Sequence, residues 1–274
     1  DKVNEAAAIA KKSDLAIVVV GENPLRYQKS KTCGENIDRM GLDLLGTQNQ
    51  LVQKIHETGV PTIVVLVGGR PLSVNWIAQN VQALVQAWEP GSLGGRALAN
   101  ILAGKVNPSA KLPISIPRHS GQIQMIYNHK PSQYFHKYID GPSTPLYPFG
   151  FGLSYTRFAY SSLKLSHTRI SDKDSFTASI ELTNVGDREG TEVVQLYIRD
   201  IYSSATRPVK ELKDFARVTL KPGEKKTVTF TVTPDKLAYW NRNMQYGVEK
   251  GEFEIMIGSS SQDKDLKKVK MEVL

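Results

Sequence analysis

Residues 15–23 read LAIVVVGEN and residues 62–69 read TIVVLVGG, two apolar runs that both end at a glycine. Each run is short and rich in β-branched side chains, which indicates a buried strand. A third strand is expected at 81–88 (VQALVQAW). Helical patterns lie between these runs, at 2–12, 47–58 and 93–103. Apolar strands that alternate with amphipathic helices predict a parallel sheet covered on both faces.

From about residue 160 the hydrophobic period changes to two. The alternating segments are FTASIELTN (176–184), TEVVQLYIRD (191–200), KKTVTFTVT (225–233) and GEFEIMIGSS (251–260). Turn signals such as VGDREG and LKPGE separate them, which predicts an antiparallel β-sandwich. The expected fold class is therefore α/β followed by all-β. We expect an α/β domain over 1–118, an ordered linker over 119–159 and the sandwich over 160–274.

The composition excludes several classes of function. The net charge is +8, but the basic residues are scattered singly, so no nucleic-acid partner is expected. Cys33 is the one cysteine, and the five histidines form no ligand cluster, so neither a disulfide nor a metal site is expected. Neither strand–helix turn has the glycine pattern of a dinucleotide or phosphate loop, so no cofactor is expected.

The longest apolar run, LAIVVV, is far too short to span a bilayer. The chain begins without Met and already inside a helical pattern. This start predicts a fragment of a longer protein or a processed product.

The loop from Gly21 to Gly46 is long and polar, and a loop of that kind in a compact domain often carries function. It contains two glutamates that each follow a glycine, Glu22 and Glu35. In open α/β sheets, ligands bind beyond the carboxyl ends of the strands, where both the Glu22 and the Gly68-Gly69-Arg70 segments are expected. Glu22 directly follows a strand, so a structural, hydrogen-bonding role is expected. Spacing alone leaves Glu35 either a solvated loop acid or a catalytic acid.

Several stretches together resemble one known family. In chain order they are SDLAIVVVGEN, TCGENIDRMGLDLLGTQNQLV, GGRPL, WEPGSLGGRALANILAGKVNPSAKLPISIP, YNHKPS, YPFGFGLSYTRF, EVVQLYIRD, RPVKELKDFARVTLKPGEKKTVTF and VEKGEFEIMIGSSS. The chain is similar, from about residue 1 to about 262, to the C-terminal part of glycoside hydrolase family 3 enzymes of the β-glucosidase and β-xylosidase type. The last three stretches resemble the fibronectin type III-like module of that family.

The resemblance implies a retaining exo-β-glycosidase that acts by double displacement. An aspartate on an N-terminal (β/α)8 barrel attacks the sugar, and a glutamate on the α/β domain protonates the leaving oxygen and later activates water. By this resemblance Glu35, in the GE-x-x-DR motif, is the general acid/base, and Glu22 is architectural. Arg39 would orient Glu35 or contact sugar hydroxyls, and Asp38 would hold Arg39; a salt bridge within the loop is the alternative. The family's proline in LPG is Leu45 here.

By this resemblance, the barrel with its aspartate and the first part of the α/β domain are missing. The parallel sheet is therefore expected to be incomplete, with an exposed edge and uncovered apolar faces. The Ser-Asp pairs, Ser13-Asp14 and Ser171-Asp172, lie at a helix–strand junction and a turn, so neither fits a barrel nucleophile. We therefore expect the chain to need a barrel as its partner, to be inactive alone, and to act on oligosaccharide or aryl β-glycoside substrates. By resemblance it is expected in the periplasm or secreted. The alternative is a non-catalytic carbohydrate- or protein-binding module, for which Tyr202, Tyr239, Trp240 and Tyr246 are the available aromatics.

Overall fold

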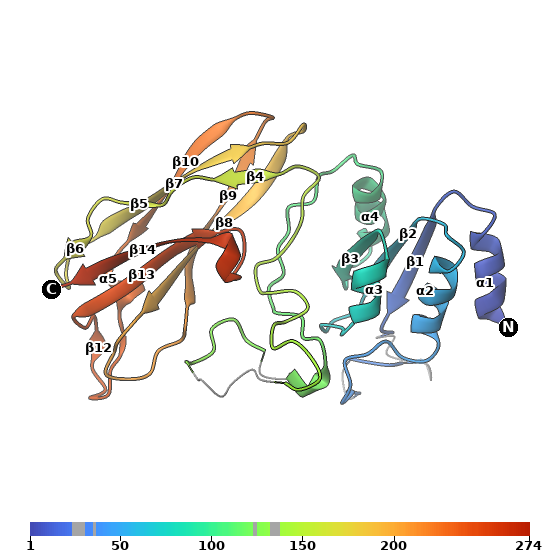
Figure 1. Cartoon of the computed structure of the whole chain (residues 1–274), viewed down its shortest axis with the longest axis horizontal. Coiled ribbons are helices and arrows are strands. Elements are labelled where there is room, and N and C mark those ends of the chain that lie inside the picture. The colour runs from blue at the N-terminus through green and yellow to red at the C-terminus, as the bar shows by residue number, and fades with distance from the viewer. Residues whose placement is uncertain (24–30, 35–36, 123–124, 132–137) are drawn as a thin grey trace. The chain divides into compact units, whose positions relative to one another are not determined.

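The structure, a computed structural model, describes residues 1–23, 31–34, 37–122, 125–131 and 138–274 (Figure 1). It divides into two compact units. The first holds residues 1–103 and a short segment that begins at Ile116. The second holds Gly104–Ser115 and the C-terminal part of the chain.

The first unit contains a parallel sheet of three strands. These are β1 (Ala16–Gly21), β2 (Thr62–Val67) and β3 (Ala83–Trp88), in the order β1-β2-β3. The two apolar runs are in register, with Val18 opposite Val64 and Val64 opposite Leu84. The three strands confirm those expected from the sequence, and their carboxyl ends meet at one edge of the sheet.

Four helices belong to this unit: α1 (Lys2–Ala10), α2 (Gln48–His56), α3 (Asn75–Asn80) and α4 (Gly94–Leu102). Val52 and Ile55 are the buried residues of α2, and His56 meets Trp76 of α3 edge to face, with ring centroids 5.4 Å apart. Thr47 takes the N-cap position of α2 without a side-chain hydrogen bond. Because i and i+3 or i+4 side chains share a helix face, Val52 and Ile55 pack together toward the sheet.

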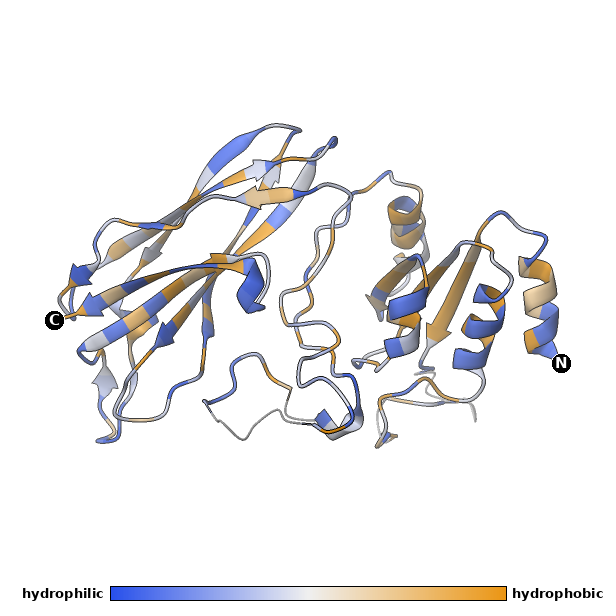
Figure 2. Ribbon diagram, viewed as in Figure 1, coloured by the Kyte–Doolittle hydropathy of each residue, from blue (hydrophilic) through white to orange (hydrophobic). Residues whose placement is uncertain are grey.

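One face of strand β1 is not covered by the described residues, as an incomplete parallel sheet predicts. Val18 and Val20 are buried, whereas Ile17 and Val19 on the opposite face are 51% and 61% exposed. Figure 2 shows the hydrophobic character of β1 and β2. Since β1 is the edge strand, this unit presents an apolar strip in addition to an unpaired strand edge.

The second unit is a β-sandwich. One sheet has the order β10-β7-β4, with β5 also paired to β7, and the other has the order β6-β14-β13-β8-β9. The strands are β4 (Phe158–Tyr160), β5 (Lys164–Leu165), β6 (Arg169–Ile170), β7 (Phe176–Asn184), β8 (Gly190–Asp200), β9 (Glu211–Leu220), β10 (Lys225–Val232), β13 (Gly251–Gly258) and β14 (Leu266–Val273). Their pairing is antiparallel except between β6 and β14, which run parallel. The predicted antiparallel sandwich is confirmed, with this one parallel pair at its edge.

Two short elements complete the second unit: helix α5 (Pro234–Leu237) and a hairpin of β11 (Tyr239–Trp240) and β12 (Tyr246–Gly247). The core is made of the inward residues of both sheets, among them the fully buried Leu182, Leu196 and Ile255. Tyr197 is also fully buried, in a second cluster with Met256 and Leu266. The period-two pattern therefore produced the two inner faces that pack together.

Candidate functional site

The carboxyl edge of the parallel sheet requires glycine at the end of β1. Gly21 has a φ of +141°, and a Cβ there would lie 1.8 Å from the carbonyl oxygen of Val67. This close approach lets the backbone N–H of Glu22 donate to that same carbonyl at 2.8 Å. Any larger residue at position 21 would separate the ends of β1 and β2.

Helix α2 also holds the end of β1, through one side chain. Gln48, the first residue of α2, accepts from the N–H of Gly21 at 2.6 Å and donates to the carbonyl of Gly21 at 3.0 Å. It also donates to the carbonyl of Leu45 at 3.1 Å. One side-chain amide thus satisfies both backbone groups of the residue before Glu22.

Glu22 carries the buried charge at this edge. Its side chain is 1% exposed, and its Oε1 atom lies 2.9 Å from Arg39 Nη1 and 2.8 Å from Arg70 Nε. Its Oε2 atom is buried and has no hydrogen-bond partner among the described residues. A buried carboxylate is tolerable only when it is paired, and here two guanidinium groups pair with it.

The two arginines reach different second partners. Arg70 Nη2 donates to Asp38 Oδ1 at 2.8 Å, and Arg39 Nη2 donates to the carbonyl of Asp43. The backbone N–H of Arg39 also donates to Asp38 Oδ1 at 2.8 Å, and this bond, followed by Arg70, lowers the pKa of Asp38. The sequence suggested that Asp38 holds the Arg39 side chain; instead Asp38 pairs with Arg70, and the Arg39 side chain reaches Glu22.

The segment before position 35 is hydrogen-bonded to the chain that follows the end of β1. The N–H of Thr32 donates to the carbonyl of Asn23 at 2.9 Å, and the N–H of Asn23 donates to Thr32 Oγ1 at 2.8 Å. Cys33 follows and is 4% exposed. Burial is the largest cause that raises the pKa of its thiol, and the carboxylates of Glu22 and Glu89 raise it further.

Glu35, the acid/base expected from the resemblance, lies outside the described residues, as does Asn36. The described residues on either side of them are joined, because the N–H of Ile37 donates to the carbonyl of Gly34 at 3.0 Å. Among the described residues no group of three His, Cys, Asp or Glu side chains could hold a metal ion.

The third strand brings two residues that the sequence analysis did not consider. Trp88, the last residue of β3, has a φ of 54°, and the strand register shifts beside it. A bulge of this kind redirects the chain, and a non-glycine residue at positive φ is strained. Glu89 follows and is exposed, and its Oε1 atom would lie 3.3 Å from a Cβ at Gly69. Glu89 directly follows a strand, as Glu22 does, and this position in the sequence is the signal by which it could have been found.

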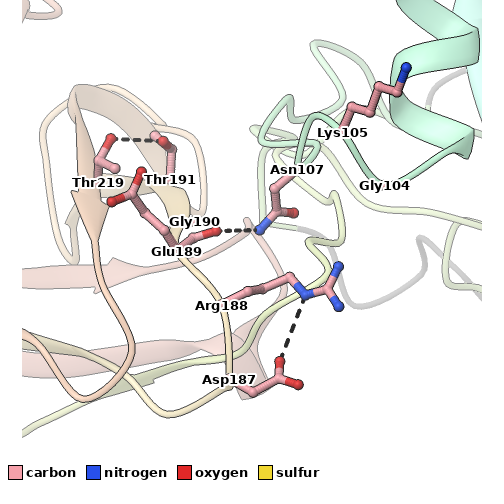
Figure 3. Close-up of a pocket in the computed structure, with 9 residues that line it drawn as sticks. All are labelled: Gly104, Lys105, Asn107, Asp187, Arg188, Glu189, Gly190, Thr191 and Thr219. Carbon is pink, nitrogen blue, oxygen red and sulfur yellow. Dashed lines mark hydrogen bonds and ion pairs between the residues drawn. The ribbon is translucent and has the colours of Figure 1, made fainter.

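A second concave site lies wholly in the second unit (Figure 3). It has a volume of about 480 Å³ and lies between the turn at 104–107 and the turn that joins β7 to β8. Its charges are mixed, with Lys105 and Arg188 facing Asp187 and Glu189. Asn107 is already bonded to the carbonyl of Glu189 at 2.9 Å. An open site with balanced charges selects no ligand class, so the carboxyl edge of the first unit is the candidate functional site.

Comparison with known proteins shows the family of the chain. Residues 1–155 match the model of the glycosyl hydrolase family 3 C-terminal domain, and residues 192–261 match that of a fibronectin type III-like domain. A beta-xylosidase of Formosa agariphila is 47% identical over 98% of this chain and 37% of its own length. A periplasmic beta-glucosidase of Salmonella typhimurium is 41% identical over 94% of this chain and 34% of its own length.

The solved structures agree. A β-glucosidase from Erythrobacter marinus superposes with a TM-score of 0.91 at 40% identity, over 99% of this chain and 36% of its own. The β-glucosidase of Listeria innocua in complex with glucose gives 0.90 at 33% identity, over 99% of this chain and 38% of its own. The chain thus spans about a third of the length of these relatives. No helix within the described residues is long and apolar enough to cross a membrane.

Proposed function

The chain belongs to glycosyl hydrolase family 3, and on this premise we propose that it is the acid/base-bearing portion of a retaining exo-β-glycosidase. β-Glucosides are the first substrate class and β-xylosides the second, because relatives of both kinds match almost the whole chain. The substrates are oligosaccharides or aryl glycosides with a terminal β-linked sugar.

Glu35 is the proposed general acid/base. The observation that carries this assignment is the ion cluster of Glu22, Asp38, Arg39 and Arg70, which anchors the chain next to position 35 at the carboxyl edge of the sheet. Two carboxylates balance two guanidinium groups in this cluster. A balanced cluster suits a neighbouring acid that must be protonated at working pH, because an uncompensated cation would lower the pKa of that acid.

The nucleophile is proposed to come from elsewhere. Retaining enzymes hold two carboxyl groups about 5 to 5.5 Å apart, one as nucleophile and one as acid/base. We assign the nucleophile to an aspartate of a (β/α)8 barrel that lies in the part of the relatives this chain does not match. Residues 1–274 alone are then inactive.

The test compares three proteins on aryl β-glucosides and aryl β-xylosides: residues 1–274, these residues supplied with their barrel, and the second protein carrying Glu35→Gln. We expect turnover by the second protein only. For Glu35→Gln we expect a loss of about 10²- to 10⁴-fold that added azide partly restores, with a β-glycosyl azide as product. Turnover by residues 1–274 alone would refute the need for a barrel. Unchanged activity of Glu35→Gln would refute the assignment of the acid.

One surface feature favours the second candidate function, a non-catalytic carbohydrate-binding module. Trp240 and Tyr246 on the β11–β12 hairpin are 61% and 56% exposed, and their ring centroids lie 5.4 Å apart. Exposed aromatic rings can stack on the faces of sugar rings. Affinity electrophoresis in gels containing β-glucan or xylan measures this binding. Retardation that Trp240→Ala abolishes would support a binding module, and unretarded migration of the wild type would exclude it.

We also propose that the protein acts in the periplasm or outside the cell, as the name of the Salmonella relative indicates for that protein. Cell fractionation with a cytoplasmic marker enzyme tests this. Recovery of the protein with the cytoplasmic marker would refute it.

A further inference from the structure

We propose that Glu22 is a positioning residue for Glu35: it fixes the chain after position 35 through its contacts with Arg39 and Arg70, and it adjoins Asn23, to which the chain before position 35 is hydrogen-bonded. The inference rests on the proposed function, because it gives Glu22 a part in that reaction. Glu22 itself is not proposed to touch the substrate. Its side chain is 1% exposed and its Oε1 atom already binds two guanidinium groups, so it is not available to a sugar.

The chain after position 35 is fixed by Arg39, four residues later. Its guanidinium spans from Glu22 Oε1, at 2.9 Å, to the carbonyl of Asp43. Arg70 contacts the same Glu22 oxygen at 2.8 Å and also donates to the carbonyl of Arg39 at 3.3 Å. Residues from the ends of β1 and β2 therefore hold both the side chain and the backbone of Arg39.

The chain before position 35 is fixed by Cys33, two residues earlier. Cys33 is buried, and burial is the largest cause that raises the pKa of its thiol, followed by the Glu22 carboxylate. The paired backbone of Asn23 and Thr32 brings Cys33 to this position directly beside the end of β1. Glu22 therefore lies between the segment paired with Asn23 before position 35 and Arg39 after it.

The Glu22 carboxylate also has little freedom to move. A Cβ at Gly68 would lie 3.2 Å from Glu22 Oε2, so the carboxylate fills the space that a side chain at position 68 would take. Replacing Glu22 by glutamine keeps this shape but removes the charge that holds two arginines. Because a general acid works only within hydrogen-bond reach of the leaving oxygen, a small shift of its flanks lowers the rate of proton transfer.

The test is the dependence of kcat/KM, which reports the glycosylation step, on the leaving group, measured in the protein that includes the barrel. Phenyl β-glycosides need protonation of the leaving oxygen, whereas 2,4-dinitrophenyl β-glycosides do not. We expect Glu22→Gln to lower the rate of glycosylation about 10- to 100-fold on phenyl glycosides and less than about threefold on dinitrophenyl glycosides. Arg39→Lys, which keeps the charge but loses the fork geometry, should show the same pattern. Should Glu22→Gln not fold, Arg39→Lys carries the test.

A Glu22→Gln change that only destabilised the fold would give a different result. It lowers the amount of active protein and reduces the rates on both substrates equally. Glu192→Gln is the matched control, because Glu192 is a buried carboxylate paired with one cation, Lys111, in the other unit. Exposed Glu57→Gln is the second control. Neither control should change the ratio of the two rates.

The double variant Glu22→Gln/Glu35→Gln decides whether Glu22 acts through Glu35. If it does, the double variant should be no more than about threefold slower than Glu35→Gln on phenyl glycosides. Full additivity, or equal losses on both substrates for Glu22→Gln, would overturn the inference while leaving the proposed function intact. Absence of a leaving-group effect in Glu35→Gln itself would instead refute the proposed function.

Discussion

Lys111 Nζ lies 2.8 Å from Glu192 Oε1, and both side chains are buried in the second unit. Lys111 belongs to the segment at 104–115, which continues from α4, and Glu192 lies on strand β8. Lys111 Nζ also donates to the carbonyl of Gly152 at 2.8 Å. This ion pair therefore holds the segment at 104–115, which has no regular secondary structure, against strand β8 of the sandwich.

Lys111→Met should destabilise the protein by about 3 kcal/mol, because it leaves the Glu192 carboxylate buried without a cation. Burial already raises the pKa of Glu192, and Lys111 opposes that rise. Without Lys111 the pKa of Glu192 rises further, so the protonated form of Glu192 is favoured. The loss of stability caused by Lys111→Met should therefore shrink as the pH falls from 7 toward 4. Urea unfolding at several pH values measures this. The double variant Lys111→Met/Glu192→Leu should recover most of the loss, and a deficit independent of pH would contradict the account.

Asp200 at the end of β8 gives a second pH dependence. Burial raises its pKa from 3.8 to about 6, and Arg207 opposes this rise. The folded protein therefore holds the proton more tightly than the unfolded chain between those pH values, and the ionised carboxylate costs stability above pH 6. We expect Asp200→Asn to stabilise the protein by about 1 kcal/mol at pH 8 and to change little at pH 4. Thermal melts at both pH values test this, with exposed Asp172→Asn as the control that changes neither.

Gly21→Ala should lower stability by about 3 kcal/mol, since the added Cβ would meet the carbonyl of Val67 at a positive φ. The matched change Gly95→Ala lies in helix α4, where a Cβ meets no atom within 4 Å. Alanine there should stabilise by about 0.5 to 1 kcal/mol because it favours the helix. Chemical unfolding of the two variants measures both effects, and equal effects of the two changes would contradict the assignment of Gly21.

The uncovered face of β1 predicts that residues 1–274 self-associate when no further segment is supplied. Ile17 and Val19 form an exposed apolar strip on an edge strand, and such surfaces promote association. Sedimentation velocity should show oligomers for the wild type and a shift toward monomer for Ile17→Thr/Val19→Thr. Leu153→Thr, at an exposed leucine of the second unit, is the control and should change nothing. A monomeric wild type would remove the basis of this prediction.

The strands were predictable because their signals are local. LAIVVV and TIVVLV are β-branched runs bounded by glycine, and they became β1 and β2 within one residue. The alternation of FTASIELTN became β7 from Phe176 to Asn184 for the same reason. The family followed from several motifs in order, which the comparisons bear out.

The pairing at the carboxyl edge was less predictable. The resemblance suggested that Asp38 holds Arg39, its neighbour in sequence, and the Arg39 side chain instead reaches Glu22, 17 residues away. Asp38 pairs with Arg70, 32 residues away. The Asp38–Arg70 contact depends on the parallel pairing of β1 with β2. The expected parallel sheet places the two strand ends at one edge, but it does not specify which side chains pair there.

The sequence by itself determined the three parallel strands, four strands of the sandwich, three of the helices, the order of α/β before all-β and the family, because hydrophobic period and motif order are properties of neighbouring residues. Tertiary structure alone decided that Glu22 is the centre of a buried ion cluster. It did so because the strand ends bring three separate segments to one edge, where a carboxylate without water must be paired with whatever cations the fold places beside it.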